Sequence, residues 1–399
     1  DVFHPYRQDS DFWYLTGFDE PDALLVLVPG RSCAESIVFC RERDSEREIW
    51  DGPRAGVDGA RADYGFGDAF PIDDVDDILP GMLEGRERVY YNLGRDSDFD
   101  QRVIGWVKRA AARGGRSRAM PEELVSVAHP LHEMRLIKSR PERERMKKAA
   151  GISADAHRRL MRAARPGCNE RELHAELLHE FCRRGCDCAY LPIVAGGANA
   201  CTLHYIRNDQ SIEDGALVLV DAGCEYDKYA SDITRTFPVS GRFSQEQRAV
   251  YDIVLEAQLA AIEQVRSDRV WSDVHDAAVA VIARGLVELG ILQGNPESVI
   301  ENGDYRRFFM HKTGHWLGLD VHDVGDYQVE GQARQLERGM VMTVEPGIYI
   351  PPGAEDVDAR WQGIGVRIED DVAVGRYGPE VLSEPIPKQP EEIEALLAD

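Results

Sequence analysis

Four acidic residues in the second half of the sequence each lie at the end of, or inside, a strand-like run. Asp221 ends the apolar run 217–220, and Asp232 lies inside the next β-prone run. Glu345 and Glu369 close two later runs of the same kind. A buried carboxylate destabilises a fold unless a cation or hydrogen bonds compensate it. These positions therefore predict that a bound cation draws the four carboxylates together.

The first two acids are placed symmetrically about the bond between Tyr226 and Asp227. If residues 225–228 form a hairpin turn, Asp221 and Asp232 are directly opposed on one face of the hairpin. Directly opposed residues have Cβ atoms about 4.5–5.5 Å apart. Two like charges at that distance destabilise the strand pair, and a cation between them would reverse the sign of the effect.

Strict alternation in the run 363–369 predicts which face carries the fourth acid. One face holds the apolar residues Ile364, Val366 and Ile368, and the other holds Gly365, Arg367 and Glu369. Arg367 therefore shares a face with Glu369 and could donate a charge-assisted hydrogen bond to a metal-binding carboxylate.

A nitrogen ligand is available in the segment M310-H-K-T-G-H-W-L-G318. His311 and His315 would share a face on a helix, but Thr313 and Gly314 make a continuous helix doubtful. On a loop, only one of the two histidines needs to reach a metal ion. Two further histidines are candidates for the same site: His204 and His322.

Two aspartates, two glutamates and one histidine form a ligand set for two metal ions. The four carboxylates carry −4 and two divalent ions carry +4, and bridging carboxylates hold such ions about 3.5–4 Å apart in two-metal hydrolases. An oxygen-rich set with one imidazole favours Mn²⁺, with Zn²⁺, Co²⁺ and Fe²⁺ as alternatives.

The remaining sequence predicts two kinds of architecture. Residues 1–107 alternate strand-like runs with loops and a helix, after an irregular opening of about twenty residues, which indicates an α/β unit. From Ser139 onward, helix-start signals precede acidic strand pairs twice, which predicts two related halves facing each other. The helix starts are expected at these residues: Ser139, Asn169, Ser244 and Ser272.

Composition narrows the range of partners. The chain of 399 residues has 47 basic and 71 acidic residues and a net charge of −24, which argues against a nucleic-acid or anionic-membrane partner. The one basic stretch, 108–118, is interpreted as a helix end and surface linker. Eight cysteines in a chain of this length favour free thiols and a reducing cytoplasm over a disulfide scaffold.

Several motifs together resemble the metallopeptidase family with the pita-bread fold, which includes methionine aminopeptidase, prolidase and aminopeptidase P. The resemblance is strongest to bacterial aminopeptidase P, the Xaa-Pro aminopeptidases, and extends over nearly the whole chain. It is carried by the hairpin of Asp221 and by the segments 5–18, 48–52, 132–139, 311–325 and 344–350.

The resemblance implies a fold and two domains. Residues 1–130 would form an α/β domain like the N-terminal domain of creatinase and prolidase, here without its expected first strand. Residues 131–399 would form an α+β pita-bread catalytic domain with pseudo-two-fold halves. Family members carry additional residues before the P-Y-R-Q segment.

The resemblance also implies the reaction, which is hydrolysis of the bond between an N-terminal residue and a following proline. Asp221 would bind one metal ion, Asp232 and Glu369 would bridge both, and His315 and Glu345 would complete the ligand set. A hydroxide bridging the metal ions would attack the carbonyl, and Glu345 would also pass a proton to the leaving nitrogen.

Further roles follow from the same resemblance. His204 and His322 would stabilise the oxyanion, and His311 would lie near the proline. Tyr349 would donate a hydrogen bond in the site, and Trp50 would reach the pocket of a neighbouring subunit in a dimer or tetramer. The expected substrates are peptides with proline in the second position. Two alternatives remain: an Xaa-Pro dipeptidase (prolidase), and a catalytically inactive pita-bread domain that serves as a binding module.

Overall fold

The computed structural model describes residues 5–114 and 121–398. The chain divides into two compact units, residues 1–132 and 133–399. The first part of the basic stretch belongs to a helix that ends at Gly114, and residues 115–118 lie outside the described part of the chain.

The N-terminal unit is an α/β unit, as predicted. Its larger sheet has the order β1-β2-β3, with β1 antiparallel and β3 parallel to β2, and β4 pairs with β5 in parallel. The strands are β1 (Leu24–Leu27), β2 (Ser36–Cys40), β3 (Asp68–Pro71), β4 (Arg88–Tyr90) and β5 (Glu123–Val125). The helices are α1 (Ser10–Thr16), α2 (Ser45–Asp51), α3 (Gly56–Tyr64), α4 (Val75–Leu83), α5 (Ser97–Gly114) and α6 (Ala128–Leu136), which runs across the unit boundary.

One prediction for this unit is wrong. The opening of the chain is not irregular throughout, because it contains α1. Asp9 caps this helix by accepting a hydrogen bond from the backbone N–H of Phe12, and Gly17 ends it with a positive φ of 63°. A helix this short presents too few turns for its apolar periodicity to be visible in the sequence.

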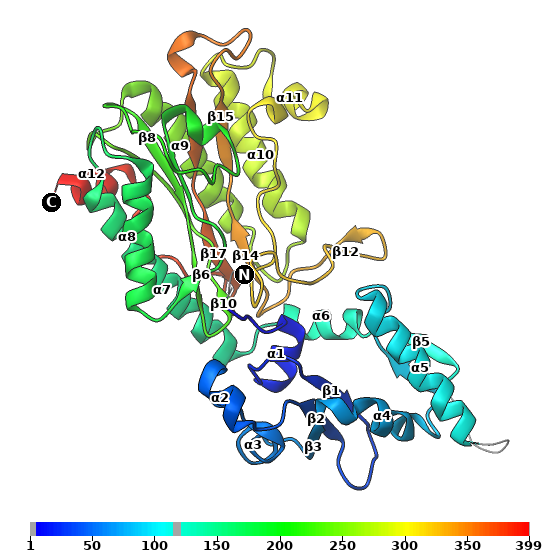
Figure 1. Ribbon diagram of the computed structural model, residues 1–399. Coiled ribbons are helices and arrows are strands. Elements are labelled where there is room, and N and C mark those ends of the chain that lie inside the picture. The colour runs from blue at the N-terminus through cyan, green and yellow to red at the C-terminus, as the bar shows by residue number, and fades with distance from the viewer. Residues whose placement is uncertain (1–4, 115–120, 399) are drawn as a thin grey trace. The chain divides into compact units, whose positions relative to one another are not determined.

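The C-terminal unit packs long helices beside short, mostly antiparallel strands. Its helices are α7 (Arg140–Ala163), α8 (Glu170–Arg183), α9 (Gln245–Ile262), α10 (Trp271–Glu288), α11 (Pro296–Asn302) and α12 (Pro390–Ala398). The helices α7 and α8 lie along one side of the strands and α10 lies along the other side (Figure 1).

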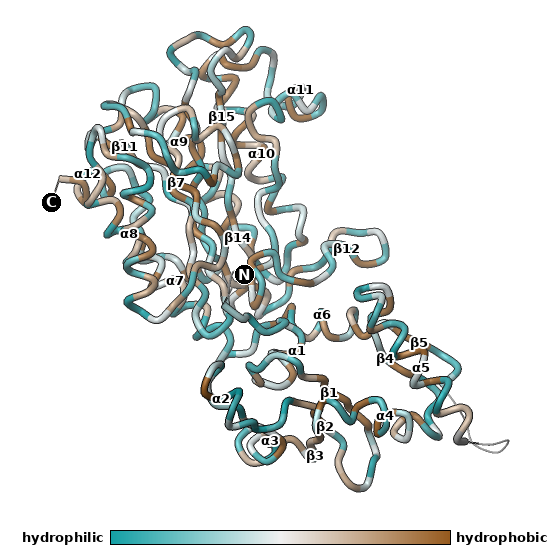
Figure 2. The backbone as a smooth tube through the Cα atoms, in the orientation of Figure 1, coloured by the Kyte–Doolittle hydropathy of each residue, from teal (hydrophilic) through white to brown (hydrophobic). Residues whose placement is uncertain are grey.

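The strands of this unit fall into two groups. The first contains β6 (Asp187–Cys188), β7 (Ile193–Gly196), β8 (Leu217–Asp221), β9 (Cys224–Tyr226), β10 (Tyr229–Ala230) and β11 (Thr234–Pro238). The second contains β12 (Gln328–Val329), β13 (Gln332–Ala333), β14 (Val341–Val344), β15 (Gly347–Ile350), β16 (Ile364–Arg367), β17 (Asp370–Val374) and β18 (Pro379–Val381). The hydrophobic segments in Figure 2 include these central strands, whose buried apolar side chains join one large core.

The predicted helix starts hold, with one small correction. Ser139, Asn169 and Ser244 each form a capping box with the residue three positions later. The fourth helix starts at Trp271 rather than Ser272, because Asp273 accepts a hydrogen bond from the backbone N–H of Val270.

The two halves of the unit are joined through β11 and the segment 367–369. The hydroxyl of Thr236 bonds the carbonyl of Arg367 at 2.9 Å, and the backbone N–H of Glu369 donates to the carbonyl of Thr234 at 3.0 Å. These bonds bring acids from both halves to one place.

The predicted register of the first hairpin is wrong by two residues. Asp221 lies opposite Thr234, not opposite Asp232. The turn is formed by Asp227 and Lys228, which both adopt positive φ angles. Its centre therefore lies one residue later than predicted, so each residue of the first strand pairs with a residue two positions further along the chain. Because the shift is even, Asp232 keeps the predicted face of its strand.

Within the described ranges, no helix is both long enough and apolar enough to span a bilayer. The eight cysteines are all free thiols.

Candidate metal centre

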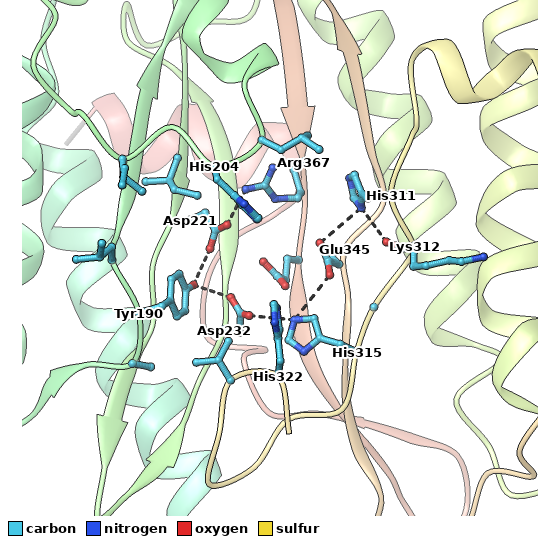
Figure 3. Close-up of a pocket in the computed structure, with 18 of the residues that line it drawn as sticks. Tyr190, His204, Asp221, Asp232, His311, Lys312, His315, His322, Glu345 and Arg367 are labelled. Atoms are coloured by element: carbon cyan, nitrogen blue, oxygen red, sulfur yellow. Dashed lines mark hydrogen bonds and ion pairs between the residues drawn. The ribbon is translucent and has the colours of Figure 1, made fainter. Parts of the chain in front are cut away.

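A cavity of about 800 Å³ opens in the C-terminal unit at the junction of the two halves. Its walls combine acidic and imidazole side chains with an apolar rim. The residues that line it are Ala189, Tyr190, Leu191, Ile193, Leu203, His204, Ile206, Asp221, Asp232, His311, Lys312, Gly314, His315, Asp320, Val321, His322, Glu345, Arg367 and Glu369. All five predicted metal ligands therefore line one cavity, and Figure 3 labels four of them: Asp221, Asp232, His315 and Glu345.

Asp221 and Asp232 are held together by a tyrosine hydroxyl. Asp221 is the last residue of β8, and Asp232 follows β10. The Tyr190 hydroxyl lies 2.6 Å from Oδ1 of each aspartate. A tyrosine hydroxyl donates only one hydrogen, so the two carboxylates must share it.

Gly223 permits the close approach of the chain around Asp232. A Cβ atom at Gly223 would lie 1.7 Å from the carbonyl oxygen of Ser231. Any larger residue would therefore push the Asp232 segment away from β8.

His315 is oriented toward the carboxylates by the backbone of the next residue. Its Nδ1–H donates to the carbonyl of Trp316 at 2.9 Å. Its Nε2 then faces Asp232 at 3.2 Å and Glu345 at 3.8 Å. A hydrogen bond that fixes one ring nitrogen and leaves the other toward the site is typical of metal-binding histidines. Residues 311–315 form no helix, and of the two histidines only His315 faces Asp232.

Glu345 and Glu369 complete the cluster from the second half. Glu345 follows β14, and Glu369 lies between β16 and β17, with its Oε2 accepting a hydrogen bond from the Thr234 hydroxyl at 2.6 Å. Ligand atoms of Asp232, His315 and Glu369 all lie within 4.8 Å of one another. As the alternation along 363–369 predicts, Glu369 and Arg367 both line the cavity, while the apolar residues that alternate with them lie in the core.

The negative charge of the four carboxylates exceeds the positive charge that the neighbouring side chains supply. Burial raises the pKa of Glu345 to about 7, and burial with the nearby acids raises the pKa of Glu369 well above its usual range. Burial likewise raises the pKa of Asp221, although Arg367 opposes this. The pKa of Asp232 is lowered despite burial, because His315 lies beside it, and Asp232 in turn raises the pKa of His315 to about 9.

This charge pattern fits divalent metal ions. Four acids converge on two cationic partners, Arg367 and protonated His315, so the site favours protons or cations. Two divalent ions would replace those protons and neutralise the four carboxylates. The oxygen-rich donors with one free imidazole nitrogen suit such ions.

Arg367 and Tyr349 support the cluster from behind. The guanidinium of Arg367 donates to Asp221 at 2.6 Å and to the Tyr349 hydroxyl at 3.0 Å. Tyr349 is fully buried and also bonds Nε2 of His311 at 2.8 Å. The predicted charge-assisted bond from Arg367 to a carboxylate is therefore present, whereas Tyr349 lies outside the set of residues lining the cavity.

The three other histidines line the cavity around the cluster. His322 packs edge-on against His315, with ring centroids 4.3 Å apart. Burial lowers the pKa of His311 to about 4 and lowers that of His322. His204 lies on the segment that follows β7, beside the apolar residues Leu203 and Ile206.

Trp50 belongs to the N-terminal unit, where it lies on α2 with 84% of its surface exposed. Its role toward a neighbouring subunit stays a prediction.

Sequence reasoning missed several residues that hold the candidate ligands in place. Tyr190 lies in an irregular segment with no periodic signal, and Thr234 is one of many threonines in strands. Asp371 accepts a hydrogen bond from the backbone N–H of Asp232 at 3.1 Å. The run of three acids from Glu369 to Asp371 is the one signal that could have indicated it.

Comparisons with known proteins agree with this geometry. The family model of metallopeptidase family M24 matches residues 144–376, and that of the aminopeptidase P N-terminal domain matches residues 1–90. The Xaa-Pro aminopeptidase of Haemophilus influenzae is 44% identical over 100% of this chain and 90% of its own length.

Solved structures give the same result. The Pseudomonas aeruginosa aminopeptidase PepP superposes with a TM-score of 0.97 at 56% identity, covering 99% of this chain and 90% of that one. The zinc-substituted Escherichia coli aminopeptidase P in complex with product has a TM-score of 0.96 at 44% identity, over 100% of this chain and 90% of that one.

Fold, acid cluster and comparisons together define a hydrolase that uses divalent metal ions, with a pita-bread catalytic unit. The chain belongs to metallopeptidase family M24 and also carries the N-terminal domain found in aminopeptidase P.

Proposed function

We propose that this chain is an aminopeptidase that removes the first residue of peptides with proline in the second position. The observation that carries the proposal is the convergence of four carboxylates and His315 in a cavity that also presents three further histidines. The full-length similarity to Xaa-Pro aminopeptidases supports the substrate class.

The five ligands would be Asp221, Asp232, His315, Glu345 and Glu369. When bound, two divalent ions supply the nucleophile and Lewis-acid polarisation for hydrolysis. His204 and His322 would donate hydrogen bonds to the carbonyl oxygen of the scissile bond as negative charge develops there.

Proline makes one proton transfer especially important. The nitrogen of an Xaa-Pro bond carries no hydrogen, so it must be protonated before it can leave as an amine. Glu345 lies in the cavity beside the other four acidic and imidazole side chains of the cluster. Its carboxylate would both bind a metal ion and pass a proton to the departing nitrogen. His311 would lie on the proline side of the bond.

The cavity lining favours longer peptides over dipeptides. In a dipeptide the C-terminal carboxylate directly follows proline, and its burial near the site requires a cation. Among the described lining residues the permanent cations are Lys312 and Arg367, and Arg367 is already bonded to Asp221. Lys312 extends away from the acid cluster in Figure 3. An aminopeptidase is therefore favoured over a prolidase.

A two-peptide assay tests this proposal. The metal-loaded protein should cleave Ala-Pro-Ala to alanine and Pro-Ala, with a much lower kcat/KM for Ala-Pro. A control peptide, Ala-Ala-Ala, should be cleaved slowly or not at all. Cleavage of Ala-Pro alone would instead identify a dipeptidase, and cleavage of none of the peptides would support a binding module.

Three finer features belong to the same proposal. Mn²⁺ is proposed as the physiological ion because the ligand set is rich in carboxylate oxygens, which metal analysis of protein purified without added metal can test. A cytoplasmic location is proposed from the free thiols, and fractionation of cells would test it.

Self-association is the third feature. Ile49 and Trp50 are neighbouring apolar side chains on α2, exposed by 81% and 84%. Side chains of this kind suit an interface with a second copy of the chain, where Trp50 could reach the partner's cavity. Light scattering of the wild-type protein and of Trp50→Ala would test for a dimer or tetramer.

A further inference from the structure

A buried carboxylate outside the metal centre is bonded entirely to one segment of the cavity wall. Glu170, the first residue of α8, is fully buried. Its Oε1 accepts hydrogen bonds from the backbone N–H of Gly196 at 2.8 Å and from Nδ2 of Asn199 at 2.9 Å. Its Oε2 accepts from the Tyr205 hydroxyl at 2.8 Å and from the backbone N–H of Gln210 at 2.9 Å.

All four donors belong to the segment 196–210, which connects β7 to the approach of β8. The same segment carries three residues that line the cavity: Leu203, His204 and Ile206. One of the donors, Tyr205, is the immediate neighbour of His204. The carboxylate of Glu170 therefore forms hydrogen bonds to the start, the middle and the end of the segment 196–210, which carries His204.

Helix capping does not account for this carboxylate. The start of α8 is already capped by Asn169, whose side chain accepts from the N–H of Arg171, and by Glu172, which bonds the N–H of Asn169 at 3.0 Å. The backbone N–H of Glu170 also donates to the carbonyl of Gln210 at 2.9 Å. Main chain and side chain of Glu170 thus both fasten the segment to the helix.

We propose that Glu170 is a positioning residue for the reaction, which acts by fixing His204 at the carbonyl oxygen of the substrate. The inference rests on the proposed function, because it assigns His204 to the developing oxyanion. Four donors converge on two oxygens, and a buried donor without an acceptor is costly. Loss of the carboxylate would let the segment move to find other partners.

The conservative test is Glu170→Gln, which keeps the size of the side chain. The amide nitrogen is a donor where an acceptor is needed. If it replaces Oε2, the Tyr205 hydroxyl can rotate to accept, but the N–H of Gln210 loses its partner. A displacement of about 1 Å at a catalytic group can lower the rate ~100-fold. We expect kcat for Ala-Pro-Ala to fall about 10- to 100-fold, with bound Mn²⁺ per chain unchanged, because His204 is not among the five ligands.

A double-mutant cycle separates positioning from a general loss of stability. In a His204→Ala background, Glu170→Gln should lower kcat by less than about twofold, since the group it positions is already gone. The matched control is Glu172→Gln on the same helix, which keeps an acceptor oxygen for the capping bond from the Asn169 N–H and should leave kcat unchanged. An equal loss of kcat with and without His204, or an unchanged kcat in Glu170→Gln, would overturn the proposal.

A milder variant covers the case in which Glu170→Gln does not fold. Tyr205→Phe removes one donor, leaves the carboxylate in place and should lower kcat by a few-fold, again only when His204 is present. Wild-type protein that binds Mn²⁺ but cleaves none of the peptides would overturn the proposed function and this role together. An active wild type with additive variant effects would overturn the positioning role alone.

Discussion

The cost of burying the charged carboxylate of Glu345 can be measured in the metal-free protein. Burial raises the pKa of this carboxyl from an ordinary value of 4.5 to about 7. A raised pKa means that the folded state holds the proton more tightly than the unfolded state. The stability contributed by that proton is present below pH 4.5 and is lost as the pH rises through about 7.

The size of the effect follows from the two pKa values. Each pKa unit corresponds to about 1.4 kcal/mol, so the metal-free wild type should lose about 3 kcal/mol through this group between pH 4.5 and pH 8. Glu345→Gln cannot ionise, and its neighbours within the site form only long contacts with the carboxylate, at 3.4–3.8 Å. At pH 8 the metal-free variant should therefore be about 3 kcal/mol more stable than the wild type.

Urea unfolding in the presence of a chelator, at pH 4.5 and pH 8, measures both proteins. The difference in unfolding free energy between the variant and the wild type should disappear at pH 4.5, where the wild-type carboxyl is protonated. Saturating Mn²⁺ should reverse the order at pH 8, because the wild type has the full set of metal ligands. Glu301→Gln, an exposed change on α11, is the control and should match the wild type. A metal-free Glu345→Gln protein that is less stable than the wild type at pH 8 would refute the argument that burial disfavours the ionised form of Glu345.

Three further changes have expected outcomes. Asp232→Asn should abolish hydrolysis of Ala-Pro-Ala while leaving the circular dichroism spectrum unchanged, and substantial remaining activity would contradict its role as a ligand. Burial lowers the pKa of His157 to about 4, so wild-type stability should fall by about 3 kcal/mol as the pH drops from 6.5 to 4. His157→Gln should flatten that part of a pH profile measured by urea unfolding. An unchanged slope would contradict the claim that His157 is buried as a neutral imidazole. Lys138→Met removes a buried partner of Asp323, 2.7 Å away, and should cost about 3 kcal/mol in urea unfolding; a loss below about 0.5 kcal/mol would contradict a structural role for this ion pair.

Local signals in the sequence determined much of the fold and the choice of candidate metal ligands. Three helix starts were readable from Ser139, Asn169 and Ser244, because a capping box needs only residues three positions apart. Alternation along 363–369 correctly indicated that Arg367 and Glu369 share a face. Such patterns depend on one strand or one helical turn, so no distant contact has to be known.

The hairpin around Asp221 shows where local reasoning ends. Symmetry about the presumed turn opposed Asp221 and Asp232, but the turn formed one residue later and placed Thr234 opposite Asp221. The position of a turn depends on which strand partners pack best in three dimensions. The two acids still meet, because Tyr190 joins them from a separate segment of the chain.

The sequence by itself determined which side chains could bind metal ions, because carboxylates that end or interrupt apolar runs are costly without a cation. Only the tertiary structure decided how they are held, through the hydroxyls of Tyr190 and Thr234 and through Asp371. These supporting residues come from strands and loops far apart in the chain. Their partners are chosen by packing across the junction of the two halves, and no periodic pattern in a single segment records such a contact.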